Sequence, residues 1–532
     1  MVDTLTEPNQ DIDPGLAGLP NRPRIWLLTV VCLGVLLVIS SMVALSTALP
    51  DIARVTSATQ TELTWIVDSY TLVLACLLLP AGALGDRYGR RGAMLFGLAV
   101  FAVASVAPAI WSDPMHIIVA RGVAGGGAAF VMPATLSLLT AAYPKDQRNK
   151  AVGIWAGVAG GGAVVGMLGS GALLHLWTWH SIFWCFAGAA LVLFVLTLTV
   201  ATSKDPEHAP LDWVGAVLIG GSVAALVFGI LEAPARGWTD PLVLGCIGVG
   251  LVLAVGFGAL EMRLRHPLLD VRLFAVPAFT TGAATITLFF LSMFGFMFLV
   301  MQYMQLILGY SAIKTAFALS PLIGPTLVLS VLSFWYLPRL GLRTVVFTGL
   351  ILIAVGLVCL SWMEVGSSYW DTAWPMLVMS TGIGFCTAPT TSAIMNTAPD
   401  DKQGVASAVN DTTREIGAAL GIALAGSMLA AQYADALTPK LAAFPAPVGD
   451  AATNSLGQAL EVAARLGPQG AQLAELSKAA FVDAMASSLL VLAALVTVSA
   501  FVIGTWAPGR GDEQLRIVRA LRTARSPGRH RA

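Results

Sequence analysis

Charged side chains are scarce in this 532-residue sequence, where Asp, Glu, Lys and Arg make up only 11% of the residues. A soluble chain would be expected to contain roughly a quarter charged residues. The composition therefore excludes a cytosolic enzyme, a nucleic-acid-binding protein and a disordered scaffold. Acidic and basic residues number 30 each, so the net charge is zero and carries no information about an acidic partner. Hydrophobic residues make up 57% of the chain, which is typical of a protein that lies mostly in lipid.

The motifs of catalysis and metal binding are also missing. The six cysteines each stand alone in a different apolar stretch, which favours a packing role over disulfides, and the six histidines show no zinc spacing. No G-x-x-x-x-G-K-[ST] loop is present, so ATP-driven transport within this chain is not expected. No G-x-S-x-G sequence opens a helix after a strand, so hydrolysis has no motif either. We therefore predict no metal, no cofactor and no enzymatic activity.

Long apolar runs recur along the whole chain, and each is long enough for a helix of about 20 residues to cross a bilayer. The runs are continuous rather than alternating, which excludes a closed barrel. We predict an all-α polytopic membrane protein with fourteen transmembrane helices. The runs lie near residues 25–49, 62–84, 93–111, 116–140, 150–174, 181–201, 211–231, 240–262, 279–302, 315–337, 343–362, 372–395, 404–432 and 480–507.

The distribution of basic residues predicts the orientation, because cytoplasmic loops are enriched in Lys and Arg. With the N-terminus inside, most basic residues fall on the inner side, including Arg87, Arg90, Arg91 and the arginines after residue 508. An even number of spans then places both termini in the cytoplasm and the protein in the inner (cytoplasmic) membrane. For the basic C-terminal tail, a solvated state is favoured over binding to anionic lipid. Residues 433–479 form a long outer loop whose Leu and Ala spacing indicates a short amphipathic hairpin.

Two loops recur about 250 residues further along the chain. The segment Asp86–Arg91 (DRYGRR) is repeated as Pro338–Arg343 (PRLGLR), and Tyr143-Pro144 is repeated as Ala398-Pro399. Parallel repeats of this kind are typical of secondary transporters that bind substrate between two bundles. We predict two pseudo-symmetric six-helix bundles with two inserted helices. The expected divisions are an N-terminal tail (1–24), an N-terminal bundle (25–201), the inserted helices (202–262), a C-terminal bundle (263–507, including the 433–479 loop) and a basic tail (508–532).

Residues 82–95, GALGDRYGRRGAML, carry a recognisable loop. It resembles the G-x-L-x-D-R-x-G-R-[RK] loop of the major facilitator superfamily. An acid beside several guanidinium groups can form a bridge that makes and breaks as two bundles rock, which favours a gating role. The alternative is that the arginines only fix the topology. The predicted gating residues are Gly82, Asp86, Arg87, Gly89, Arg90 and Arg91.

Further segments extend this resemblance along nearly the whole chain, among them ELTWIVDSYTLVLACLLLPAG, MPATLSLL, WHSIF, LLDVRLF and AVNDTTREIGAALG. Together they are similar to the fourteen-helix drug:proton antiporters of the quaternary-ammonium-compound exporter type. The resemblance implies export of lipophilic cations against an inward flow of protons, the proton gradient being the energy source. Its expected partners are small lipophilic cations, protons and membrane lipid, without nucleic acid, and we expect a monomer.

The chain departs from this family at several positions, most notably in the first helix, where Ser41 stands in place of the usual Asp. This departure keeps open an alternative function, the export or flipping of a lipid or a native metabolite with altered or no proton coupling. A membrane-embedded enzyme would need a cluster of catalytic residues at one face of the membrane, and no such cluster is present in the sequence.

Ionisable residues within apolar spans are expensive unless they are paired or line a wet cavity, so each is a functional candidate. Asp68 and Arg121 lie at similar depths on their helices, and they are predicted to meet. Forming and breaking that pair would change the proton affinity of the carboxyl group, although a permanent structural ion pair is the alternative. On the thirteenth span Asp411 and Glu415 share a face, and Arg414 borders it. These residues are predicted to couple protons and bind cations, against the alternative of an internally neutral Asp411–Arg414 pair.

Aromatic side chains supply the apolar part of a cation site through cation–π attraction. Trp65 lies one helical turn before Asp68 and shares its face, whereas Tyr70 is turned away from that face. Phe290 and Phe294 are the predicted aromatic residues of the cavity on the ninth span, where Phe289 and Tyr303 also lie. The alternative for this group is contact with lipid.

Overall fold

The computed structural model describes residues 20–56, 58, 60–201, 212–264, 267–441, 444–466 and 470–510. In these residues the chain forms α-helices with short 3-10 and π segments and no strand, which confirms the predicted all-α class. The expectations for the tails before residue 20 and after residue 510 lie outside the described residues.

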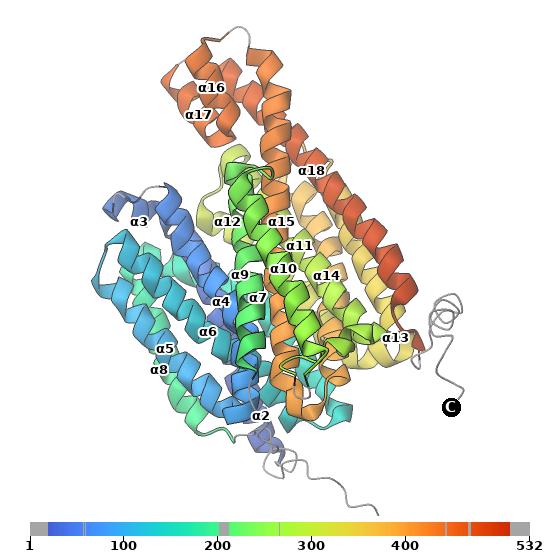
Figure 1. Cartoon of the computed structure of the whole chain (residues 1–532). Coiled ribbons are helices and arrows are strands. Elements are labelled where there is room, and N and C mark those ends of the chain that lie inside the picture. Colours follow the sequence, from blue (N-terminus) through green and yellow to red (C-terminus); the bar gives the residue numbers. More distant parts are fainter. Residues whose placement is uncertain are drawn as a thin grey trace, which may run out of the picture.

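Figure 1 shows two groups of long helices side by side, each packed within itself. We call them the N-terminal and C-terminal bundles. The first contains α2 (Asn21–Ala44), α4 (Gln60–Tyr88), α5 (Arg90–Ile110), α6 (Pro114–Ala142), α7 (Lys145–Leu176) and α8 (His180–Leu198), with the short α3 (Leu49–Thr56). The second contains α11 (Pro277–Gln302), α13 (Ile323–Leu360), α14 (Tyr369–Thr397), α15 (Gln403–Leu437) and α18 (Gly470–Trp506), with the short α12 (Ala312–Ala318).

Local sequence signals set several helix ends. The side chain of Asp240 accepts hydrogen bonds from the backbone N–H groups of Leu242 and Val243, and Pro241 follows it at the first helical position. Asp113 caps α6 in the same way through the N–H of His116, and this hydrogen bond lowers the pKa of Asp113. Such caps satisfy N–H groups that have no partner within the helix.

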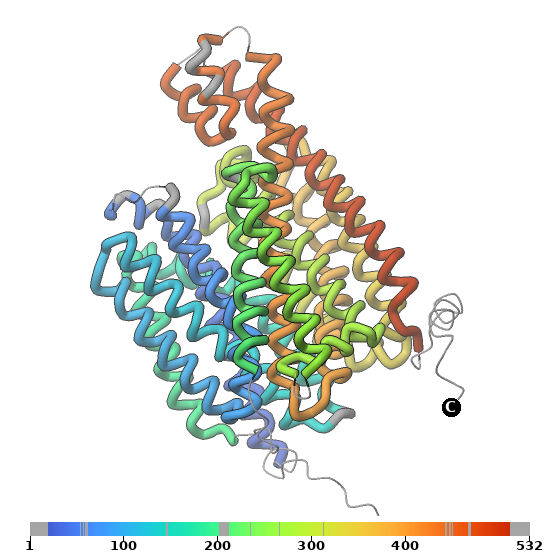
Figure 2. Tube along the Cα trace, viewed as in Figure 1, coloured from blue at the N-terminus to red at the C-terminus, as the bar shows by residue number. Residues whose placement is uncertain are grey.

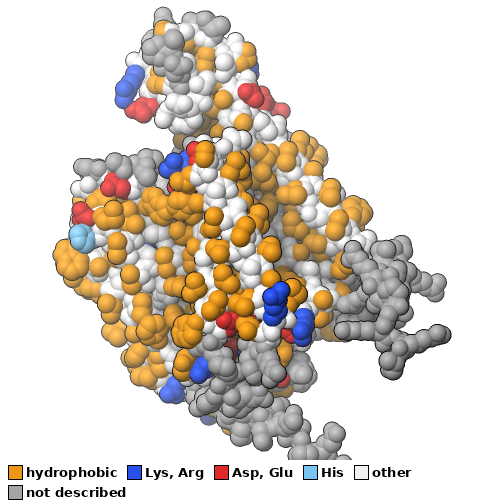
Figure 3. All heavy atoms as spheres, in the orientation of Figure 1, with side chains coloured by type: hydrophobic (Ala, Val, Ile, Leu, Met, Phe, Trp, Pro, Cys, Tyr) orange, Lys and Arg blue, Asp and Glu red, His pale blue; other side chains and the backbone are white. Residues whose placement is uncertain are grey.

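The described residues contain 12 helices that are long and apolar enough to cross a membrane. The stretch Ile313–Leu360 holds two of the expected spans, joined where Gly341 adopts a non-helical conformation in α13. The expected span 372–395 lies on α14, whose threonines, serines and prolines make it less apolar than the others. The expected spans therefore all lie on helices, and the chain is a multi-pass membrane protein. In Figure 3 the hydrophobic side chains cover the middle of the visible face, with charged side chains above and below them.

The internal repeat is visible in the backbone. Gly89, between α4 and α5, has a φ of 112°, and Gly341, at the corresponding position of the second bundle, has a φ of 77°. A positive φ is readily adopted only by glycine, so the two reversals use the same residue type for the same geometric reason. This agreement confirms the repeat that the sequence predicted.

We name the two ends of the molecule by their loops. The motif face carries the Asp86–Arg91 loop and the loop before α15, and the hairpin face carries α16 (Ala446–Asn454) and α17 (Leu456–Arg465). In Figure 2 the traces of α15 and α18 continue upward beyond the other helices to reach this pair. The sequence predicts the hairpin in the second part of the loop, residues 456–476, where α17 packs against α18 (Gly470–Trp506).

The inserted helices are α9 (Trp213–Arg236) and α10 (Pro241–Glu261), which pack against each other. α9 also contacts one helix of each bundle, α4 and α15. A small buried apolar cluster joins the three helices and consists of Ala75 from α4, Val223, Val227 and Ile230 from α9, and Ala419 and Ala423 from α15. The insertion thus lies across the boundary between the bundles rather than apart from them.

Candidate functional site

A central cavity lies between the two bundles. Residues of α2, α6 and α7 form one wall, and residues of α11, α13, α14 and α15 form the other. Its volume of about 90 Å³ is well below that of a typical ligand pocket, so a drug-sized molecule requires the bundles to separate. Most of the lining is apolar, and its larger side chains are Phe289, Phe290, Phe294, Met42, Met132, Met293 and Met297.

The charged side chains of the cavity wall both come from α15, and they are Arg414 and Glu415. The third member of the predicted set, Asp411, lies one turn away, with its Oδ1 3.8 Å from Nη1 of Arg414. Each of the three residues is at most 7% exposed. The structure therefore places Asp411, Arg414 and Glu415 close together on α15, with Arg414 and Glu415 in the cavity wall.

Arg414 and Asp411 are held in a polar network with α14. Nδ2 of Asn410 donates to Oδ1 of Asp411 at 3.0 Å, and Oγ1 of Thr391 donates to Oδ1 of Asn410 at 3.0 Å. Nη2 of Arg414 donates to Oγ1 of Thr391 at 3.3 Å. Glu415, by contrast, forms no hydrogen bond to any described residue. The three charges sum to minus one when both carboxyl groups are ionised, and Glu415 carries the uncompensated charge.

Arg414 already lies over aromatic side chains, of which Phe290 lines the cavity and Trp155 does not. The Cζ atom of Arg414 lies 5.0 Å from the ring centroid of Trp155 and 5.5 Å from that of Phe290. Phe290 stacks in turn on Phe294, with centroids 6.0 Å apart. In this state the guanidinium group of Arg414 covers the ring of Phe290, which the sequence predicts for cation–π contact with a bound ligand. A bound cation would have to share that ring with the guanidinium group or displace it.

Arg121 does not pair with Asp68, which corrects the sequence-based expectation. Its Nη1 donates to Oγ of Ser41 at 3.0 Å, its Nη2 to the Ser41 carbonyl at 3.2 Å, and its Nε to the Ile66 carbonyl at 3.2 Å. Its Cζ lies 4.2 Å from the ring centroid of Tyr70. Ser41 thus accepts from the arginine, at the position where the family resemblance implies an acid.

Asp68 and Trp65 lie instead beside the inserted helix α9. The ring centroids of Trp65 and Phe228 are 5.8 Å apart, and the charge of Glu232 on α9 acts on Asp68. Glu232 is itself bonded to Nε of Arg236 at 2.6 Å. Neither Trp65 nor Asp68 lines the central cavity. These two predicted site residues therefore belong to the α4–α9 contact.

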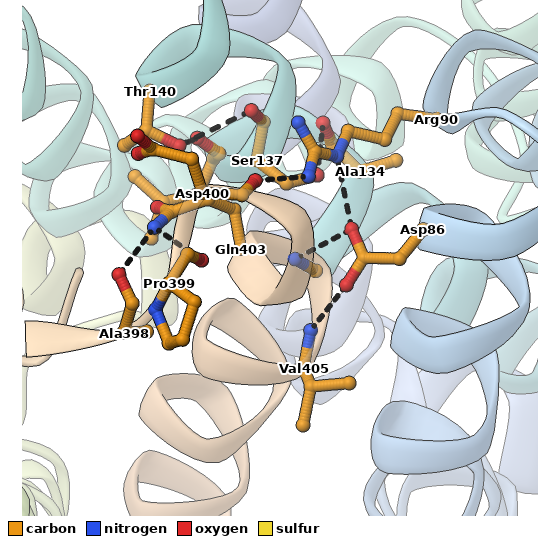
Figure 4. Close-up of polar contacts among 12 residues, drawn as sticks. Asp86, Arg90, Ala134, Ser137, Thr140, Ala398, Pro399, Asp400, Gln403 and Val405 are labelled. Atoms are coloured by element: carbon orange, nitrogen blue, oxygen red, sulfur yellow. Dashed lines mark hydrogen bonds and ion pairs between the residues drawn. The ribbon is translucent and has the colours of Figure 1, made fainter. Parts of the chain in front are cut away.

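The motif face is closed by contacts between the bundles (Figure 4). Asp86, at the end of α4, accepts hydrogen bonds from the backbone N–H groups of Gly404 at 2.9 Å and Val405 at 3.1 Å, at the start of α15. Its Oδ1 also accepts from Nε of Arg90 at 2.9 Å. The carboxylate therefore caps a helix of the opposite bundle and satisfies N–H groups at its positive end.

The neighbouring polar contacts also cross between the bundles. Arg90 donates to the Asp400 carbonyl at 3.0 Å, and Arg148 pairs with the Asp400 carboxylate at 3.3 Å. Nδ2 of Asn396 donates to Oδ1 of Asn149 at 3.2 Å. Arg148, Asp400, Asn149 and Asn396 were not predicted, because their role depends on a partner about 250 residues away in the sequence. We call Asp86, Arg90, Arg148 and Asp400 the motif-face latch.

The other predicted gating residues have different roles. Arg91 donates to the Val200 carbonyl at the end of the same bundle, and Arg87 lies over the ring of Tyr88, with its Cζ 5.3 Å from the centroid. Gly89 supplies the positive φ of the reversal. Gly82 lies at the crossing of α4 and α15, where a Cβ would lie 2.6 Å from the carbonyl oxygen of Gly404.

Gly404 tests whether this close approach closes the motif face. A Cβ there would lie 2.6 Å from the Gly82 carbonyl and 2.7 Å from Oδ1 of Asp86. We expect Gly404→Ala to disfavour the closed state by about 1–3 kcal/mol, the usual range for overpacking. Spin labels at Gln147 and Lys402, one on each bundle, should then report a longer distance. Gly92→Ala is the control, because its Cβ would meet no atom within 4 Å, and an unchanged distance in Gly404→Ala would contradict the prediction.

Within the described residues, no group of three or more His, Cys, Asp and Glu side chains is arranged to hold a metal ion. The sequence did not predict that Ser41 and Tyr70 contact Arg121 or that Trp155 packs on Arg414. Tyr70 and Trp155 lie in apolar stretches, and nothing in their spacing signals that each packs on an arginine.

The chain is similar to known proteins both in sequence and in fold. Residues 31–422 match the model of the Major Facilitator Superfamily. The chain is 30% identical over 510 residues to the tetracenomycin C resistance and export protein of Streptomyces glaucescens, with 94% of this chain and 95% of that protein covered. It is 30% identical over 474 residues to the methyl viologen resistance protein SmvA of Salmonella typhimurium, with 86% and 93% covered. The solved structure of the proton:xylose symporter XylE has a similar fold, with a TM-score of 0.57, 15% identity, and 94% of this chain and all of that chain covered.

Proposed function

This chain belongs to the Major Facilitator Superfamily, and we propose that it is a proton-coupled secondary transporter that exports lipophilic, mostly cationic compounds by alternating access. The observation that carries the proposal is the cavity between the bundles, where the uncompensated carboxyl group of Glu415 faces aromatic and methionine side chains. Such a lining offers an organic cation both apolar contact and a counter-charge.

The relatives support export of drugs rather than of a lipid. One is named for resistance to and export of tetracenomycin C, and another for resistance to methyl viologen, which is an organic dication. The alternative of a lipid or metabolite exporter is not favoured by these names. Because one chain supplies the whole cavity wall, we expect the monomer to be the transport unit.

We further propose the orientation and the moving parts. The motif face is rich in arginine and is assigned to the cytoplasm, with both termini there and the protein in the cytoplasmic membrane. Residues 25–201 and 263–507 move as two bodies, with residues 202–262 inserted between them. Breaking the motif-face latch opens the cavity to the cytoplasm, where a cation enters. Protonation of Glu415 from outside removes its charge, and the cation leaves.

Ethidium efflux from loaded cells tests the proposal. Expression of the protein should accelerate efflux, and a protonophore should abolish the acceleration, because collapse of the proton gradient removes the driving force. Glu415→Gln is the matched variant, since it keeps the shape of the side chain but cannot lose a proton. Efflux that ignores the protonophore would contradict proton coupling, and an absence of accelerated efflux would contradict drug export.

A further inference from the structure

A buried polar stripe runs along α15 from the motif face to the central cavity. Gln403, Ser407, Asp411 and Glu415 follow one another at intervals of four residues, so each is the neighbour of the next along one ridge of the helix. Their exposed fractions are 1%, 0%, 1% and 7%. The stripe begins beside the latch, where Nε2 of Gln403 donates to the carbonyls of Met395, Ala398 and Pro399, and it ends at the carboxyl group that lines the cavity.

Three of these side chains present a buried oxygen that has no hydrogen-bond partner among the described residues. They are Oε1 of Gln403, Oγ of Ser407 and Oδ2 of Asp411. A buried polar atom without a partner is costly, and such atoms in folded proteins are nearly always bonded to protein or to ordered water. Three such atoms in succession on one helix therefore point to bound water.

The spacing of the stripe fits this ligand. Four residues of α-helix rise about 6 Å, and two hydrogen bonds of about 2.8 Å through one water span nearly the same distance. A single water between successive side chains would therefore satisfy each of the three oxygens. The opposite carboxylate oxygen of Asp411 is held by Asn410, which leaves Oδ2 for this role.

Charged groups lie beside the stripe on α15 and near its two ends. Arg414 lies beside Asp411 on α15 itself. At the motif end, Asp86, Arg90 and Arg148 from the N-terminal bundle meet Asp400. At the cavity end, Tyr70 from α4 lies within electrostatic range of both Arg121 and Glu415. Acids and bases are thus present at both ends, so neither end of the stripe excludes a positive charge.

We propose that this stripe and its bound waters form the path by which a proton leaves Glu415 for the motif face. This inference rests on the proposed proton-coupled transport. The O–H bond of the protonated Glu415 breaks, its electron pair stays on the carboxylate, and the proton passes to a neighbouring water. That water passes a proton to Oδ2 of Asp411, which releases one to the next water. The hydroxyl group of Ser407 accepts one proton and donates another, and the last water, beside Gln403, releases one to the solvent.

The path explains how a closed latch is compatible with proton release. The contact of Gly82 with Gly404 leaves no room there for a drug molecule, whereas a proton needs only a chain of hydrogen bonds. Substrate and proton then use different routes at the motif face, and the proton can leave before the latch opens. One net proton moves for each Glu415 carboxyl group, and no group is oxidised or reduced.

Ser407 is the point at which the path can be cut without changing a charge. Ser407→Val fills the space of the hydroxyl group and an adjoining water with methyl groups, whereas Ser407→Ala leaves room for a water in place of the hydroxyl group. Ser488→Val is the matched control, because Ser488 is also 0% exposed but its hydroxyl group donates to the Ala484 carbonyl on α18. The full-length variants are purified, reconstituted in liposomes and assayed with ethidium.

We expect Ser407→Val to slow ethidium transport driven by a pH gradient by about tenfold or more, the usual scale for losing a proton-transfer group. Ethidium exchange without a pH gradient, which needs no net proton movement, should fall much less. Ser407→Ala should retain most of the gradient-driven transport. Full gradient-driven transport in Ser407→Val, an equal fall in exchange, or the same loss in Ser488→Val would overturn the path.

A second measurement tests the waters directly in the wild-type protein. X-ray-generated hydroxyl radicals label side chains next to bound water, so the peptide that contains residues 403–415 should be labelled despite its burial. Absence of label would overturn the path even if Ser407→Val fails to fold. Failure of the proposed function has a different signature, because the wild-type protein would then ignore the pH gradient while the peptide was still labelled.

Discussion

Replacing Asp86 with asparagine is expected to slow the transport of every substrate to a similar extent, by about tenfold or more, because hydrogen bonds to a charged group contribute about 1.5–3 kcal/mol each. The Asp86 carboxylate accepts from two backbone N–H groups of α15 and from Arg90. Asparagine keeps the size of the side chain but loses the charge, and its amide group offers one acceptor oxygen in place of two. The closed state of the motif face should therefore lose much of its stability.

Transport assays with several substrates measure the effect, and spin labels at Gln147 and Lys402 report the opening of the motif face. Asp401→Asn is the control, because Asp401 is exposed and belongs to the same loop as Asp400. A loss confined to one substrate would mean that Asp86 takes part in recognition. An unchanged distance between the labels together with slow transport would mean that the latch does not depend on this charge.

Replacing Glu415 with glutamine should reduce the efflux of cations far more than that of neutral drugs. A cation about 6 Å from an ionised carboxylate, at an effective dielectric near 20, is attracted by about 2–3 kcal/mol, which corresponds to a loss of roughly 30- to 100-fold on neutralisation. A neutral ligand gains almost nothing from the same charge. Arg414 does not cancel this attraction, because Asp411 and the rings of Trp155 and Phe290 already engage it.

The comparison with Asp68→Asn makes this test specific. The sequence predicts both Asp68 and Glu415 as acids that attract the cation. Because Asp68 lies beside α9 and not in the cavity lining, we expect Asp68→Asn to reduce cation efflux much less than Glu415→Gln does. Equal losses for cations and neutral drugs in Glu415→Gln would restrict the acid to proton coupling. A larger loss in Asp68→Asn than in Glu415→Gln would place the cation site at α9.

The helices and the charged cluster of α15 could be read from the sequence because each depends on local spacing, and the repeat could be read because two loops recur in the sequence itself. Run length predicts a span, and i, i+4 spacing places Asp411 and Glu415 on one side of a helix whatever surrounds it. Spacing does not tell which neighbouring helix a given face points toward. Each residue turns about 100° around the helix axis, so a small error in the assumed orientation changes the partner. Asp68 and Tyr70 are two residues apart, so when Tyr70 meets Arg121, Asp68 must point elsewhere.

The motif-face latch could not be predicted from the sequence for a related reason. Asp86 was identified from its loop, but its donors are backbone N–H groups at Gly404 and Val405, which carry no side-chain signal. In the sequence, Asp400 and Arg148 cannot be distinguished from other charged residues near helix ends, and their ion pair appears only when the two bundles are in contact. The available hint was the pair Gly82 and Gly404, which lie on α4 and α15, since glycines on helices allow a close approach of backbones.

The inserted helix α9 has a mechanical consequence. α9 contacts α4 of one bundle and α15 of the other, so it should hold the two bundles together on that side. The interface between the bundles should be freer to widen on the opposite side. The contacts of α9 include the small residues Ala75, Ala419 and Ala423, which can slide past one another with little steric resistance. The rotation axis between the two bundles should therefore lie closer to α9 than in a bundle pair without the insertion. The bundles should then separate more on the side opposite α9 than on the side of α9.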